Sequence, residues 1–136
     1  MAIERTGKAA ELFEKAKNLY KKDDNAGAVA MFSEVINLLP DDADSIHLRS
    51  MAYKNLGNLE KAAADIEKML ELRPELCGTE YFLLAQVYEK KGNKNKAIEY
   101  YQKSVEHGDF DNQSLQGLKR LGATSGNMNS GNVEFR

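Results

Sequence analysis

The chain has 136 residues, of which 19 are basic and 21 acidic, and its formal net charge is −2. Chains of this length usually form one domain that buries a core without covalent cross-links. The charges are nearly balanced and interleaved along the chain, which excludes the basic footprint of a nucleic-acid binder and the acidic excess of a disordered tail. We therefore expect a folded domain that has no nucleic-acid partner.

Three further features bear on the compartment. Cys77 is the only cysteine, so an intrachain disulfide and the usual cysteine-rich zinc site are both excluded. The first eight residues carry charges where a secretory signal would need an apolar core. The longest nonpolar run, residues 26–32, is too short to span a bilayer. These features predict a cytoplasmic protein without membrane insertion.

Two stretches of the chain, YKNLGNLEKAAADIEKMLELRP and YEKKGNKNKAIEYYQKSVEHGD, share a tyrosine, a Gly-Asn pair and a Lys-Ala pair at matching places. The only two prolines, Pro40 and Pro74, lie 34 positions apart, and good helix formers dominate the composition. Aligned on the prolines, the chain reads as three copies of one unit. The copies cover residues 9–42, 43–76 and about 78–109, with Cys77 as an insertion at the second junction.

Each copy is expected to form two helices joined by a tight turn, because apolar residues recur at helical spacing on both sides of a turn signal. The turn residues are Gly57 in the second copy and Gly92 in the third, since glycine accepts a positive φ without steric cost. The first copy has Asp23-Asp24-Asn25 there, which tolerates that conformation less well than glycine does. Small residues recur where the helices must approach closely, namely Ala16, Ser50 and Ala85 on the first helices and Ala28, Ala62 and Ala97 on the second.

This pattern resembles the tetratricopeptide repeat (TPR), a helical hairpin of 34 residues. The residues that carry the resemblance are Leu12, Ala16, Leu19, Ala28, Phe32, Pro40; Ile46, Ser50, Tyr53, Gly57, Ala62, Pro74; and Tyr81, Ala85, Tyr88, Gly92, Ala97, Tyr101. The resemblance implies an all-α fold, a right-handed superhelical α-solenoid of stacked antiparallel helix pairs, in a single domain over residues 1–122. Lys15 and Arg49 depart from the pattern at positions that leucine often fills.

The last copy needs a cover, because one hairpin cannot bury its own apolar face. Residues 111–121 are predicted to form a capping helix that starts at Asp111. Its apolar side chains, Phe110, Leu115, Leu118 and Leu121, should face the last repeat, while Gln113, Gln116, Lys119 and Arg120 face water. A truncated further repeat is the alternative and has the same packing consequence. Residues 123–136 have no period, and we expect a flexible tail.

No motif for catalysis, a cofactor or a metal is evident. His47 and His107 lie in different repeats, without a neighbouring acid or nucleophile pattern. The turn glycines stand alone and do not form a phosphate-binding loop, and packing at a repeat junction explains Cys77 more simply than a nucleophilic role. The chain is therefore predicted not to be an enzyme and to need no cofactor.

In the family, as the resemblance implies, the first helix of each repeat lines a concave groove. Helical spacing assigns to this groove Phe13, Lys17, Tyr20, Lys21; His47, Leu48, Met51, Lys54, Asn55; and Phe82, Gln86, Glu89 and Lys90. Aromatic and thioether side chains beside lysines suit an extended or helical peptide that has apolar anchors and some acidic groups. Phe13, Leu48, Met51 and Phe82 could instead pack between neighbouring helices, and both roles stay open.

One branch of the family grips the C-terminal carboxylate of chaperone tails with a clamp of basic and amide side chains. The corresponding five positions here hold Phe13, Lys17, Leu48, Thr79 and Leu83, none of which matches the clamp. The sequence therefore predicts a monomeric, non-catalytic adaptor or scaffold for a protein or peptide other than such a tail. A self-associating assembly subunit is the alternative, and a small secretion-type chaperone is a variant of the adaptor.

Overall fold

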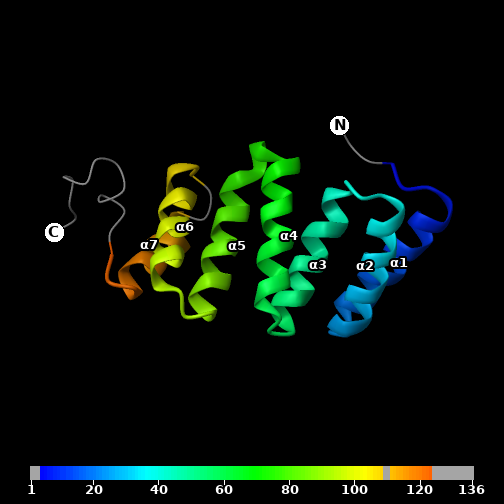
Figure 1. Ribbon diagram of the computed structural model, residues 1–136, viewed down its shortest axis with the longest axis horizontal. Helices are drawn as coiled ribbons and strands as arrows, with labels where there is room; N and C mark the ends of the chain where they lie inside the picture. The colour runs from blue at the N-terminus through cyan, green and yellow to red at the C-terminus, as the bar shows by residue number, and fades with distance from the viewer. Residues whose placement is uncertain (1–3, 109–110, 124–136) are drawn as a thin grey trace. The chain divides into compact units, whose positions relative to one another are not determined.

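Within residues 4–108 and 111–123, which the computed structural model describes, every regular element is helical (Figure 1). The elements are α1 Gly7–Lys21, α2 Asn25–Leu38, α3 Ala43–Asn55, α4 Leu59–Leu72, a short 3₁₀ helix Pro74–Leu76, α5 Cys77–Lys90, α6 Lys94–Glu106 and α7 Asp111–Arg120. The predicted all-α fold is confirmed. The predicted tail, apart from Ala123, lies outside the described residues, as does Phe110.

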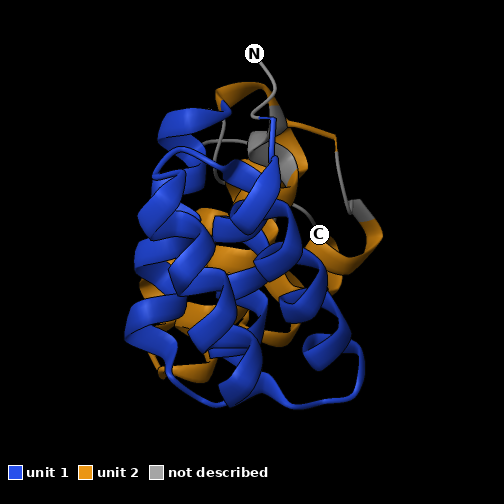
Figure 2. Cartoon of the chain, turned by 90° about the vertical axis from the view of Figure 1, so that its right-hand side faces the viewer, with its two compact units in different colours: residues 1–73 blue, residues 74–136 orange. Residues whose placement is uncertain are grey.

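The chain divides into two compact units, residues 1–73 and 74–136 (Figure 2). The first unit holds α1 to α4, and the second holds α5 to α7. The division falls between Arg73 and Pro74, just before the end of the second predicted copy, so the first unit holds two helical hairpins and the second holds one hairpin and α7. The single domain over residues 1–122 stays a prediction.

The turns inside the three hairpins share one backbone conformation. Gly57 and Gly92 have φ angles of 80° and 84°, and Asp23 at the equivalent place has a φ of 66°. Asp23 tolerates this left-handed conformation because short polar side chains are among the few that visit it. The next residue, Asp24, caps α2 by accepting a hydrogen bond from the backbone N–H of Gly27 at 2.9 Å. The predicted turns are confirmed.

Helix α5 is one residue longer than α3, and this difference shows where the third copy of the repeat carries its additional residue. Both begin three positions after a proline, but α5 has 14 residues and α3 has 13. When the two helices are aligned on their turn glycines, Gly57 and Gly92, the additional residue is the first one of α5. The side chain of Cys77 itself lies outside those described.

The core of the first unit forms where α1, α2 and α3 meet. Phe32 is fully buried there, and its ring meets that of Phe13 edge to face with centroids 5.9 Å apart. Ala16 and Ala28 have no exposed surface, as expected where two helices approach closely. A second cluster joins α2, α3 and α4 through Ile36, Ala43, Ile46, Met69 and Leu72.

Arg49, which departs from the repeat pattern, ties three helices of the first unit together. Its Nε and Nη2 donate to the two carboxylate oxygens of Asp65 on α4 at 2.9 and 2.8 Å. Its Nη1 donates to Ser33 on α2 at 3.0 Å. Asp65 is buried, and its hydrogen bonds with Arg49 raise the pKa of Arg49. Arg49 thus supplies the positive charge that the buried carboxylate of Asp65 requires.

The second unit is a hairpin of α5 and α6 covered by α7. Ala85 and Ala97 are fully buried between the paired helices. Tyr100 of α6 stacks on Tyr81 and Tyr88 of α5, with ring centroids 5.9 and 5.6 Å apart. These contacts form the expected hairpin core.

Helix α7 approaches the hairpin over Tyr101, whose side chain is almost fully buried. A Cβ atom on Gly117 would lie 2.6 Å from the Tyr101 ring, so only glycine fits at this contact. Ser114 donates a hydrogen bond to Ser104 of α6 at 2.9 Å, and Leu118 is buried nearby. The contact stripe of α7 thus runs through Ser114, Gly117 and Leu118.

The predicted contact stripe of α7 is therefore partly wrong. Leu118 is buried as predicted, but Leu115 is 39% exposed. The buried stripe is shifted by one position relative to the predicted one. The reason is that α7 lies so close to the ring of Tyr101 that only small residues fit against it. The side chain of Asp111, the predicted cap, lies outside those described.

Candidate protein-binding surface

Phe13, the first residue assigned to the groove, is 7% exposed and packs in the core of the first unit. Arg5, which precedes α1, lies over its ring with the guanidinium carbon 3.7 Å from the centroid. Arg5 is held by Asp42, just before α3, through Nε–Oδ2 and Nη2–Oδ1 contacts of 2.6 and 3.1 Å. Of the two roles left open for Phe13, the structure therefore shows packing in the core.

The other groove residues of the first unit keep part of their surface exposed. Those that are half-buried are Lys17, Tyr20, His47, Leu48, Met51 and Lys54, and those that are exposed are Lys21 and Asn55. Tyr20 and Leu48 rest against the buried cluster around Phe32. Lys17 lies 3.1 Å from the carboxylate of Glu14. α1 and α3 therefore offer partly exposed apolar side chains among lysines.

In the second unit, Phe82 is 9% exposed and packs 6.1 Å from the ring of Tyr101, measured between centroids. It is therefore a packing residue. Gln86 is half-buried and Lys90 is exposed. These two line a hollow of about 330 Å³ together with Glu89, Tyr101 and Arg120. The hollow joins the groove face of α5 to α6 and α7.

Glu89, Tyr101 and Arg120 form a hydrogen-bonded cluster in this hollow. Arg120 donates Nε and Nη2 to the two carboxylate oxygens of Glu89, each at 2.7 Å. The Tyr101 hydroxyl donates to Glu89 Oε1 at 2.7 Å. The hydrogen bond from Arg120 lowers the pKa of Glu89, and burial raises the pKa of Tyr101. The ion pair is therefore fully charged at neutral pH.

Arg120 and Tyr101 were not assigned to the groove from the sequence, which placed Arg120 in water. The sequence did contain a signal for Arg120. In each repeat, the first helix carries a groove residue two positions before the turn residue that has a positive φ. Arg120 stands in that relation to Gly122, whose φ is 78°. It matches Lys21 before Asp23 and Lys90 before Gly92. α7 therefore ends as a first helix does.

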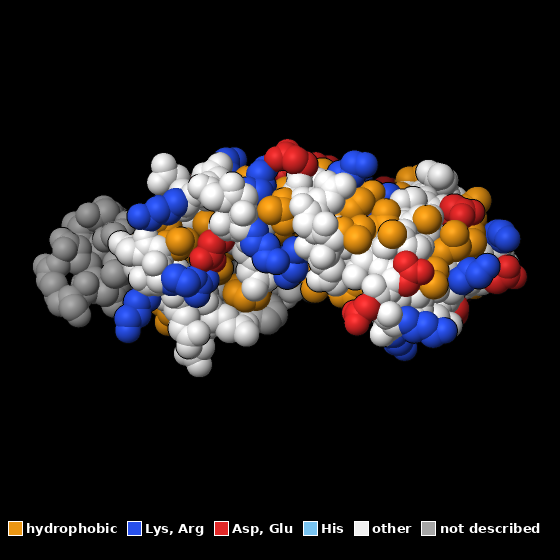
Figure 3. All heavy atoms as spheres, turned by 90° about the horizontal axis from the view of Figure 1, so that it is seen from below, with side chains coloured by type: hydrophobic (Ala, Val, Ile, Leu, Met, Phe, Trp, Pro, Cys, Tyr) orange, Lys and Arg blue, Asp and Glu red, His pale blue; other side chains and the backbone are white. Residues whose placement is uncertain are grey.

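The face seen from below Figure 1 shows acidic, basic and hydrophobic side chains mixed together, without a block of one charge (Figure 3). Among residues 4–108 and 111–123 there is no group of three or more His, Cys, Asp or Glu side chains that could hold a metal ion. In the same ranges, no helix is long and apolar enough to cross a membrane.

A sequence model of the family described as "Tetratricopeptide repeat" matches residues 43–76 and 81–106. The first range coincides with the second predicted copy, and the second range lies within the third copy. Together they contain α3 to α6, apart from the start of α5. The chain belongs to the TPR family. Its three hairpins and its covering helix give the TPR solenoid fold, as the likeness to solved TPR domains shows.

The TPR chain is 30% identical over 121 residues to "Hsp70-Hsp90 organizing protein 2" of Arabidopsis thaliana, a match that covers 88% of this chain and 21% of that protein. It thus spans about a fifth of the length of the curated relatives it matches. It is similar in structure to the first TPR of Spaghetti (RPAP3) bound to the HSP90 peptide SRMEEVD, with a TM-score of 0.77, 16% identity and coverage of 90% and 95% of the two chains. The TPR2B domain of yeast Sti1 in its pHsp70 complex gives a TM-score of 0.73 with 23% identity and coverage of 84% and 95%.

Proposed function

We propose that this chain is a non-catalytic adaptor module whose first helices hold a segment of a partner protein. The observation that carries the proposal is the row of partly exposed apolar and lysine side chains on α1 and α3. Leu48 and Tyr20 rest on a rigid buried cluster there and keep exposed surface for a ligand. The TPR relatives named as chaperone organising proteins, and the peptide-bound TPR domains, support this role.

The proposal is tested by affinity capture from the native source with the full chain as bait. Met51→Glu places a charge on the groove face of α3 and should remove the captured partner. Ala64→Glu, an equal change on the exposed side of α4, should retain it. Lys21→Glu is a second groove variant at an exposed site, for use if Met51→Glu loses its helical circular dichroism. Retention of every partner by both folded groove variants contradicts the proposal.

The prediction that the chain lacks a chaperone-tail clamp gives a separate test. Two of the five corresponding positions, Phe13 and Leu83, hold buried apolar side chains. We expect that any affinity for SRMEEVD is the same within about twofold when its C-terminus is amidated, because no side chain pairs with that carboxylate. Isothermal titration calorimetry makes the comparison. A loss of about tenfold or more on amidation would show that a clamp exists after all.

The protein is proposed to act as a monomer. The large apolar side chains that the described residues expose, Leu38, Leu56 and Leu115, come from different parts of the chain and are typical of isolated surface leucines. Light scattering after size exclusion should give one mass at all concentrations, whereas a self-associating subunit would give a mass that rises. The lone cysteine supports a cytoplasmic location, which imaging of a tagged chain would check.

A further inference from the structure

The hollow in the second unit has an excess of positive charge. Its lining contains two cations, Lys90 and Arg120, and one carboxylate, Glu89. The three groups come from the end of α5 and the end of α7. One net positive charge therefore faces the opening, beside the groove face of the third repeat.

Part of this charge is available for a ligand. Over the described residues, the ammonium group of Lys90 makes no ion pair, and its side chain is exposed. Arg120 uses Nε and Nη2 for Glu89 and Tyr101, which leaves its Nη1 amino group for another acceptor. Its side chain is 54% exposed, so an incoming group can reach it.

The cluster also holds Arg120 in place. Two hydrogen bonds to Glu89 and one to the hydroxyl of Tyr101, a residue almost fully buried, fix the plane of the guanidinium. A ligand that binds a side chain already ordered loses less conformational entropy than one that must order it. The guanidinium of Arg120 is therefore already ordered before a ligand arrives.

We propose that this hollow is a subsite for one carboxylate group of the bound partner, held between Lys90 and Arg120. One carboxylate matches one net positive charge, and a planar carboxylate suits an arginine N–H donor. A doubly charged group fits less well, because Glu89 lies in the same hollow. The inference rests on the proposed function and specifies its partner, a protein segment that has an acidic residue next to its apolar anchors.

The test uses the full chain labelled with ¹⁵N and a small probe, N-acetylglutamate α-amide, titrated at constant ionic strength. Saturable NMR shifts are expected at the Arg120 Nε–H and the backbone amides of residues 86–90. The neutral N-acetylglutamine amide should produce none. N-acetylalanine, titrated separately, shows whether a C-terminal carboxylate serves as well as a side-chain one.

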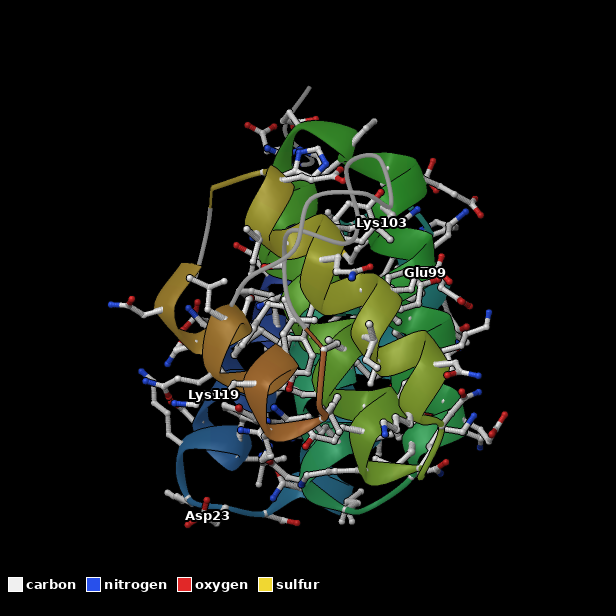
Figure 4. All side chains as sticks on the ribbon, turned by 90° about the vertical axis from the view of Figure 1, so that its left-hand side faces the viewer. Asp23, Glu99, Lys103 and Lys119 are labelled. Atoms are coloured by element: carbon white, nitrogen blue, oxygen red, sulfur yellow. The ribbon has the colours of Figure 1, made fainter. Side chains whose placement is uncertain are left out.

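Matched variants locate the site. Lys90→Gln and Arg120→Gln should each weaken probe binding by about fivefold, as expected for the loss of an exposed ion pair. Lys119→Gln removes the same charge from the neighbouring position of α7, which is labelled in Figure 4, and should change the affinity by less than about twofold. Lys94→Gln is the corresponding control for Lys90.

Equal effects of Lys90→Gln and Lys94→Gln, or equal shifts with the neutral amide, would overturn the proposal. Lys90→Gln keeps the test valid even if Arg120→Gln unfolds α7, because Lys90 is exposed. The outcome is independent of partner capture, which depends on Met51 in the other unit. If the probe does not bind at this hollow but the partner is still captured through the groove, the subsite alone is refuted. If the probe binds but no partner depends on the groove, the proposed function is refuted.

Discussion

In each unit another helix covers one face of a helical hairpin, and the two units do this in different ways. In the first unit the α1–α2 hairpin is covered by α3, part of a second full hairpin, and the contact is a cluster of apolar side chains around Phe32. In the second unit the α5–α6 hairpin is covered by α7 alone, a helix of 10 residues. This shorter helix compensates with a close approach at Gly117 and with the ion pair of Arg120. A short covering helix that buries little apolar area thus depends on a close steric fit and on an ion pair.

Phe32→Ala should produce the largest effect, because it removes a fully buried ring from the apolar contact of the first unit. We expect a loss of about 3–5 kcal/mol in the free energy of unfolding, measured by urea denaturation with circular dichroism. Leu38→Ala on the same helix, where the side chain is 52% exposed, should change it by less than about 0.5 kcal/mol. Similar values for the two variants would contradict the core assignment.

Gly117→Ala tests the close approach in the second unit. Alanine is normally the better helix former by about 1 kcal/mol, so a stabilised protein would refute the contact. We expect instead a loss of about 1–3 kcal/mol, because the new methyl group meets the Tyr101 ring. Gln116→Ala, at the exposed neighbouring position, is the control in the same urea titration.

Arg49→Met tests the polar tie of the first unit. Asp65 would lose the partner of its buried carboxylate, at an expected cost of about 1–2 kcal/mol because Arg49 itself is partly exposed. The double variant Arg49→Met/Asp65→Leu should recover most of that loss, since no buried charge remains. A double-mutant cycle of thermal unfolding measures the coupling. Additive losses would mean that the pair is not coupled.

The ion pair of Arg120 should give the smallest effect, a dependence of stability on pH. The folded pKa of Glu89 lies below its ordinary value of 4.5, chiefly because Arg120 donates hydrogen bonds to it. The pair therefore stabilises the fold above that value and stops doing so as the pH falls through the folded pKa. Melting temperatures between about pH 6 and about pH 3 should fall less steeply in Arg120→Gln than in the parent protein.

Lys119→Gln is the control for this pH dependence, because it removes a positive charge from the neighbouring position of α7 (Figure 4) and leaves the Arg120–Glu89 ion pair in place. Its melting curve should keep the acid dependence of the parent. Glu99 and Lys103, an exposed pair on α6 whose charges lie 3.9 Å apart, should contribute little. Identical slopes for Arg120→Gln and the parent protein would show that Glu89 is not held by Arg120.

Much of the fold could be predicted because its signals are local. The left-handed turns at Gly57 and Gly92 and the buried alanines Ala16 and Ala28 follow from spacing alone. The site was harder to predict, since helical spacing assigns a residue to a face but does not say what covers that face. Phe13 lies on the predicted face, yet Arg5 lies across its ring.

By itself, the sequence determined the helical hairpins, their period and their turns, because helix periodicity and the φ of a turn residue depend on neighbours within a few positions. Only the tertiary structure decided which polar groups meet. Arg5 with Asp42, Arg49 with Asp65 and Arg120 with Glu89 join residues that are 37, 16 and 31 positions apart. Such pairs depend on how closely the helices approach, and that distance is set by the volume of side chains from several helices at once.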